Sequence, residues 1–115
     1  MDRLRRIPVV FWRSLAGQEP APDWLNDLTK EEKKVVGRDI SKAQYGWPLG
    51  LPLCRSLGDG LWEMRSSLPT RREARILFVF HDGMLVALHA FFKKTRATPL
   101  AELELARRRR REMEL

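Results

Sequence analysis

Hydrophobic and polar residues follow strand-like patterns in the second half of the chain. Residues 61–66 alternate between apolar and charged or polar side chains, which is typical of a strand with one buried face. Residues 75–81 are apolar on both faces and predict a central strand, and residues 84–92 predict its partner. The Asp-Gly pairs at 59–60 and 82–83 predict tight hairpin turns. We therefore expect antiparallel strands in this half.

The first half predicts one strand followed by two helices. Residues 7–13 are rich in β-branched and aromatic residues, which favours a strand. This strand is expected to end before Gly17, Pro20 and Pro22, which do not favour a continued strand. Residues 23–28 are long enough for two helical turns packed on a core.

A capping box predicts the start of the second helix. The Thr29 hydroxyl can accept a hydrogen bond from the backbone N–H of Glu32, and the Glu32 carboxylate can accept one from the backbone N–H of Thr29. Apolar residues then recur at helical spacing, and the helix is expected to end by Gly46. From there to residue 60 the glycines and prolines limit regular structure to a short piece near residues 53–57.

The end of the chain predicts a last helix. Thr98 is a suitable N-cap and Pro99 suits the first helical position. A narrow apolar stripe follows, and then five consecutive arginines from Arg107 to Arg111. The order of elements predicts an α+β fold within one domain over residues 1–115. We expect an antiparallel sheet of about four to five strands, with two N-terminal helices packed on it and a C-terminal helix.

Composition narrows the class of protein. The 115 residues are 43% hydrophobic and 32% charged, as in a globular domain. No uncharged apolar stretch approaches the ~20 residues of a membrane-spanning helix. The single cysteine, Cys54, excludes an internal disulfide framework, and with two histidines it does not favour a zinc site. We expect a cytoplasmic protein that needs no metal or other cofactor.

The charge balance points to an anionic partner. There are 22 lysines and arginines against 15 aspartates and glutamates, giving a formal charge of +7. This excess favours nucleic acid, although an anionic membrane surface or an acidic protein would also satisfy it. The phosphate-binding, dinucleotide, metalloprotease and calcium motifs are absent from the sequence. A basic constellation remains in or beside the expected sheet: Arg65, Arg75, His81, His89, Lys93 and Lys94.

Such cations suit RNA cleavage without a metal. The reaction needs a base for the 2′-hydroxyl, cations for the pentavalent phosphorane and an acid for the leaving 5′-oxygen. Other cations close to a lysine lower its pKa towards neutrality, so that it can exchange protons at cellular pH. The guanidinium of arginine stays charged and can bind two phosphate oxygens at once.

Several segments carry a resemblance to a known family. They are Trp24-Leu25, residues 57–65, residues 73–78, residues 88–95, and Thr98-Pro99 followed by Glu102, Glu104 and Ala106. In this order and spacing the chain resembles the HigB-like, phage-derived branch of the RelE/ParE toxin superfamily. The resemblance implies a microbial-ribonuclease-like sheet and a toxin of a type II toxin–antitoxin system that cleaves mRNA, usually on the ribosome.

The resemblance also implies site residues and partners. Arg65 and Arg75 would stabilise phosphate, and Lys93 or Lys94 would transfer protons or bind phosphate. The expected partners are a helix-turn-helix antitoxin, mRNA and the ribosome, with operator DNA reached only through the antitoxin, and no membrane. The residues expected to contact nucleic acid are Arg55, His81, His89, Arg96, Arg107 and Arg108.

Other interpretations stay open for the same residues. Arg65 can pair with Glu63 or Glu73 on an exposed face, and the two lysines can be an edge pair that discourages aggregation. His89 fits a core or rim histidine. At the level of function, the alternatives are a ParE-like toxin that binds gyrase without cutting RNA, or a nucleic-acid-binding module without catalysis.

Overall fold

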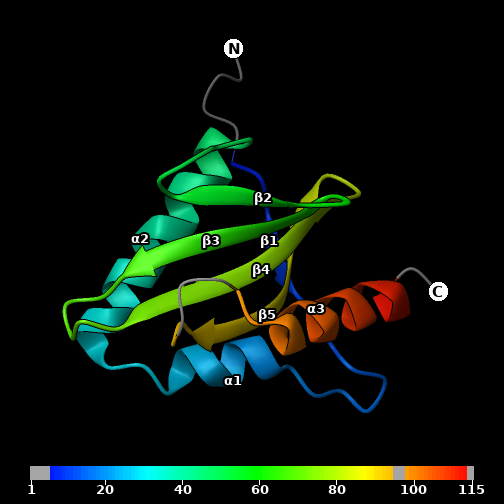
Figure 1. Cartoon of the computed structure of the whole chain (residues 1–115), viewed down its shortest axis with the longest axis horizontal. Helices are drawn as coiled ribbons and strands as arrows, with labels where there is room; N and C mark the ends of the chain where they lie inside the picture. The colour runs from blue at the N-terminus through cyan, green and yellow to red at the C-terminus, as the bar shows by residue number, and fades with distance from the viewer. Residues whose placement is uncertain (1–5, 95–97, 114–115) are drawn as a thin grey trace.

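The computed structural model describes residues 6–94 and 98–113, in which a five-stranded sheet lies between helices (Figure 1). Both of its faces are covered. The elements in chain order are β1 (Val9–Phe11), α1 (Pro20–Asn26), α2 (Lys30–Gly46), β2 (Cys54–Gly58), β3 (Leu61–Ser67), β4 (Glu73–His81), β5 (Met84–Phe92) and α3 (Leu100–Met113).

The sheet is mixed, with strand order β1-β5-β4-β3-β2. The strands β2 to β5 are antiparallel neighbours, as expected. The expectation of a purely antiparallel sheet is wrong, because β1 pairs with β5 in parallel, with Val9 opposite Leu85 and Phe11 opposite Ala87. This pairing joins segments far apart in sequence, which periodicity within one segment does not encode.

Both hairpin turns have the backbone that the Asp-Gly pairs predict. Asp59 and Gly60 have φ angles of 53° and 79°, and Asp82 and Gly83 have 52° and 77°. Two successive positive φ values match the right-handed twist of the flanking strands. The predicted hairpins β2–β3 and β4–β5 are confirmed.

The capping box at the start of α2 is also confirmed. The Glu32 amide donates to Thr29 Oγ1 at 3.2 Å, and the Thr29 amide donates to Glu32 Oε1 at 3.0 Å. The short helix predicted over residues 23–28 is α1, but it begins three residues earlier, at Pro20. Proline suits the first helical position, where the missing N–H leaves no bond unmade.

Two hydrophobic clusters give the molecule its layers. The first lies between the sheet and the pair α1 and α2, and the second lies between the sheet and α3. In Figure 1, α3 accordingly crosses in front of the sheet and α2 behind it. The α+β class and the C-terminal helix are therefore confirmed, and α1 and α2 follow a first strand, as the predicted order of elements has it. None of the helices in the described part of the chain is both long and apolar enough to span a membrane.

Candidate nucleic-acid interface

The strand register brings two of the predicted arginines side by side. Arg65 on β3 lies opposite Arg75 on β4, and Arg75 lies opposite Phe91 on β5. Residues directly opposite in neighbouring strands point to the same face of a sheet. Leu61 and Leu77, which share this alternation, pack with Ala106 of α3. The two arginines are therefore on the face that α3 partly covers.

Two glutamates link these cations into a chain of alternating charge. Glu63 Oε1 lies 3.6 Å from Arg75 Nε and 4.0 Å from Arg65 Nε. Glu73 Oε2 lies 3.7 Å from Arg75 Nη2 and 3.4 Å from Lys93 Nζ. We call Arg65, Arg75, Lys93 and these two glutamates the central cluster. Three of the four residues predicted to be catalytic thus come together.

Arg75 is the most constrained member of the central cluster. It is only 2% exposed, and burial lowers the pKa of its guanidinium, against the opposing effect of the Glu63 carboxylate. Among the described residues, neither Nη1 nor Nη2 has a hydrogen-bond partner. Buried donors without acceptors are costly to a folded protein. An anion that reached Arg75 would supply the missing acceptors.

The segment before α3 borders the central cluster. The Thr98 hydroxyl, predicted as a helix cap, donates a 2.5 Å hydrogen bond to Glu63 Oε2. The side chains of Arg65 and Lys93 remain 31% and 20% exposed. Solvent therefore reaches the central cluster at these two cations.

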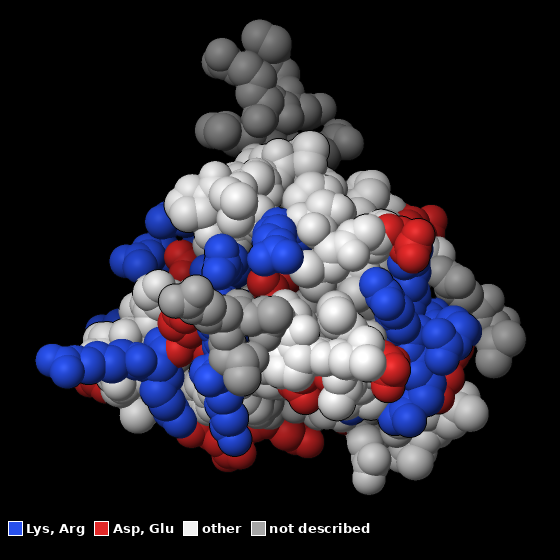
Figure 2. Space-filling model, in the orientation of Figure 1, with Lys and Arg blue, Asp and Glu red and all other residues white. Residues whose placement is uncertain are grey.

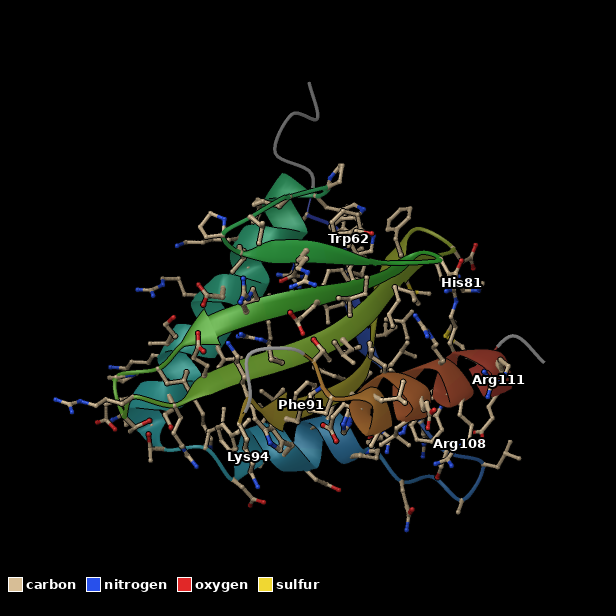
Figure 3. All side chains as sticks on the ribbon, in the orientation of Figure 1. Trp62, His81, Phe91, Lys94, Arg108 and Arg111 are labelled. Atoms are coloured by element: carbon tan, nitrogen blue, oxygen red, sulfur yellow. The ribbon has the colours of Figure 1, made fainter. Side chains whose placement is uncertain are left out.

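The other predicted residues lie around the central cluster. Lys94 lines a separate hollow beside α1, and His81 lies at the far end of β4 (Figure 3). Arg55 on β2 is exposed and lies opposite Glu63. Arg96 lies outside the described residues.

His89 connects β5 to α3. Its Nε2 lies 2.8 Å from Glu102 Oε2, and its Nδ1 lies 3.4 Å from Arg109 Nη1. Because Arg109 can only donate, the neutral ring carries its proton on Nε2. Burial lowers the pKa of His89, although the bond to Glu102 raises it. The interpretation of His89 as a rim histidine therefore fits its contacts.

The arginine run forms a second group of cations. Arg108 and Arg111 are exposed on α3, whereas Arg107 is half-buried. Figure 2 shows lysine and arginine side chains gathered over β2 and β3 and along α3, on one face of the molecule. Nucleic acid lying on this face could therefore contact both groups.

Sequence reasoning gave too little weight to three polar residues. Glu63 was expected only as a surface partner of Arg65, but it is 1% exposed. The sequence predicts Thr98 as a helix cap, and Glu102 enters only through the family resemblance. The shared period of Glu63 and Arg65 on one strand was the available signal, whereas the contacts of Thr98 and Glu102 depend on how α3 docks.

Metal ligands do not gather in the described ranges. Among residues 6–94 and 98–113, no group of three or more His, Cys, Asp or Glu side chains is placed to hold a metal ion. The chemistry available at the central cluster from these residues is that of guanidinium, ammonium and carboxylate groups.

Comparison with known proteins identifies a family. No curated protein matches the chain at a significant level. A family model described as "Phage derived protein Gp49-like (DUF891)" matches residues 23–111, which run from α1 into α3 and include the whole central cluster. The chain therefore belongs to the Gp49-like family of phage-derived proteins, a family of RelE-like toxins associated with toxin–antitoxin systems.

Proposed function

We propose that this protein is the toxin of a type II toxin–antitoxin pair and that it cleaves messenger RNA at the central cluster without a metal. The observation that carries the proposal is the pair of buried Arg75 nitrogens that lack acceptors, directly opposite the half-exposed Arg65. Two guanidinium groups in this arrangement suit the non-bridging oxygens of one phosphodiester.

The proposed reaction is an internal transesterification. The 2′-oxygen attacks phosphorus, the bond from phosphorus to the 5′-oxygen breaks, and a 2′,3′-cyclic phosphate is left. A base takes the proton of the 2′-hydroxyl, and an acid protonates the leaving 5′-oxygen. Arg65 and Arg75 stabilise the negative charge of the phosphorane, and Glu63 positions both guanidinium groups.

Lys93 suits proton transfer better than Lys94. Its ammonium group contacts Glu73, which also contacts Arg75, so it lies in the same network as the phosphate-binding arginine. Lys94 is exposed and lines the neighbouring hollow, where it suits a contact with an adjacent part of the RNA.

The proposed partners follow from the same surface. A helix-turn-helix antitoxin would neutralise the toxin by covering the central cluster or by displacing α3, and operator DNA would be reached only through that antitoxin. The ribosome would present the mRNA. The cations over β2, β3 and α3 lie on one face and support an extended RNA contact.

Primer extension on cellular mRNA tests the cleavage. We expect Arg65→Ala to reduce cleavage by about 10²-fold or more, and Arg75→Lys to do the same because lysine cannot bind two phosphate oxygens in parallel. Arg38→Ala is the matched control, since it removes one exposed arginine from α2 on the opposite layer.

Thermal melting and antitoxin binding show whether the variants fold. Cleavage by folded Arg65→Ala and Arg75→Lys proteins at the rate of the parent protein would refute the assignment. Growth arrest with intact transcripts and damaged DNA would indicate a gyrase-binding toxin instead. Absence of growth arrest from the chain expressed without an antitoxin would indicate a binding module.

A further inference from the structure

An open hollow adjoins the central cluster at the end of β5. Its volume is about 380 Å³, within the usual range of small-ligand sites, and it is open to solvent. It exists because β1 pairs only with residues 85–87, which leaves the last part of β5 without a neighbouring strand on that side. Residues of α1, β5 and the start of α3 line it: Trp24, His89, Phe91, Lys94, Pro99 and Glu102.

Phe91 places this hollow beside the proposed phosphate site. It is the direct partner of Arg75 in the sheet, so the two side chains share one face. Figure 3 shows Phe91 and Lys94 at the end of β5, between α1 and the start of α3. A nucleotide whose phosphate contacted Arg75 would therefore have its base, or that of its neighbour, within reach of the hollow.

Aromatic side chains give the hollow flat walls. The rings of His89 and Phe91 are stacked, with centroids 5.3 Å apart and an interplanar angle of 22°. Trp24 also lines the hollow, and its ring packs on Phe92 with centroids 4.8 Å apart. Unpaired RNA bases are commonly bound by stacking on such rings.

The polar groups of the hollow match the edge of a base. Glu102 Oε2 is held by His89, and the Glu102 side chain is 27% exposed, so its carboxylate can accept further hydrogen bonds. The ammonium group of Lys94 supplies a hydrogen-bond donor. The amide of Lys93 bonds the carbonyl of Glu73, so by alternation the backbone groups of Ala90 point away from β4 towards the open edge.

We infer that this hollow is a nucleobase subsite and that the base it prefers is guanine. Guanine is the base whose pairing edge carries two adjacent donors, N1–H and N2–H, and these fit the two oxygens of one carboxylate. Its O6 can accept from Lys94. The inference rests on the proposed function, since it assigns the subsite to the RNA that the central cluster would cut. His89 acts as a positioning residue that fixes the Glu102 carboxylate.

Binding of short RNA analogues to the full chain tests the subsite. The probes are dye-labelled 2′-fluoro oligonucleotides, which lack the attacking hydroxyl, and they differ only in whether one central base is guanine, adenine, cytosine or uracil. Fluorescence anisotropy gives each Kd. We expect the guanine probe to bind about tenfold more tightly than the others, in line with the value of a good paired contact.

Glu102→Gln separates recognition from structure. The amide still accepts the proton of His89, but it cannot accept two bonds from guanine as a carboxylate does. We expect the ratio of the Kd of the adenine probe to the Kd of the guanine probe to fall close to one, while the Kd of the adenine probe stays unchanged. Phe91→Leu should weaken all four probes by about tenfold through loss of stacking. Phe80→Leu, at an exposed phenylalanine of β4, is the matched control and should change nothing.

The outcomes distinguish the subsite from the proposed function. An unchanged guanine preference in a folded Glu102→Gln protein, or equal binding of all four probes, would overturn the subsite even if the protein cleaves RNA. A guanine preference that depends on Glu102 in a protein that cleaves no RNA would support the subsite and refute the nuclease.

Discussion

Glu32 shows how one side chain joins a helix to the sheet. Besides capping α2, its carboxylate accepts the Thr70 hydroxyl at 2.6 Å and Arg72 Nη2 at 2.8 Å, from the turn between β3 and β4. Arg72 also lies 3.8 Å from the centre of the Phe92 ring. The hydrogen bond from Thr70 is the largest of the causes that lower the pKa of Glu32 from 4.5 to about 2.

This lowered pKa predicts a loss of stability in acid. A carboxyl with a lower pKa in the folded state stabilises the fold above its ordinary pKa, and that contribution disappears as the pH falls from 4.5 towards about 2. We expect the urea midpoint of the parent protein to drop across this range and that of Glu32→Gln to drop less. Glu31→Gln, at an exposed neighbour, should follow the parent. Parallel curves for the parent and Glu32→Gln would contradict the prediction.

Cys54 is predicted to be inert in the folded protein. It is fully buried, and burial raises the pKa of its thiol from 9.0 to about 11, with a smaller contribution from Asp39. The reactive thiolate is then about a hundredfold scarcer at neutral pH, and reagents cannot reach it. We expect iodoacetamide to modify the protein much faster in urea than in buffer. Because Cys54 is the single cysteine, mass spectrometry reports on it directly, and equal rates would refute its burial.

At the scale of elements, local patterns predicted what depends on neighbours in the sequence. The alternation of residues 61–66 predicted β3, the apolar runs at 75–81 and 84–92 predicted β4 and β5, and the Asp-Gly turns joined β2 to β3 and β4 to β5. The Thr29 and Glu32 pair gave the start of α2. Each of these depends on residues within a few positions of one another, so the sequence shows them directly.

Contacts between distant elements were beyond the same reasoning. Nothing in residues 7–13 indicates that β1 lies parallel to β5, because the strand pattern is the same for either direction. The alternation along β3 put Glu63 and Arg65 on one face, but it did not show that Thr98, just before α3, contacts Glu63. The cations and the pairing of Arg65 with Glu63 were therefore predictable, whereas the burial of Glu63 and its contact with Arg75 were not.

The packing of α3 on the sheet predicts how a substitution in this helix changes stability. Ala106 is fully buried against the sheet, where it packs with Leu61 and Leu77. Ala106→Leu would overfill this contact and cost about 1–3 kcal/mol. We expect Tm to fall by roughly 4 °C or more, measured by circular dichroism. Ala101→Leu, at an exposed position of the same helix, should leave Tm nearly unchanged, and equal shifts in both variants would show that α3 is not seated by Ala106.

At the scale of the whole molecule, the two faces of the sheet differ in chemistry. The face towards α1 and α2 is packed with apolar side chains, and the cavity beneath α2 is lined by apolar residues. The face towards α3 carries the central cluster, the hollow beside Phe91 and the exposed arginines of α3. A formal charge of +7 is therefore less informative than its placement, because cations on one face can contact a single polyanion together.

This placement predicts how salt weakens RNA binding. Each phosphate contact with single-stranded nucleic acid adds about 0.7 to the slope of log K against log salt. If Arg108 and Arg111 contact RNA, replacing both with glutamine should lower that slope by about 1.4. Lys33→Gln with Lys34→Gln removes the same charge from the exposed side of α2, behind the sheet, and should leave the slope nearly unchanged. Equal losses of slope in the two double variants would mean that RNA responds to net charge alone, and that the face carrying the central cluster has no special part in binding.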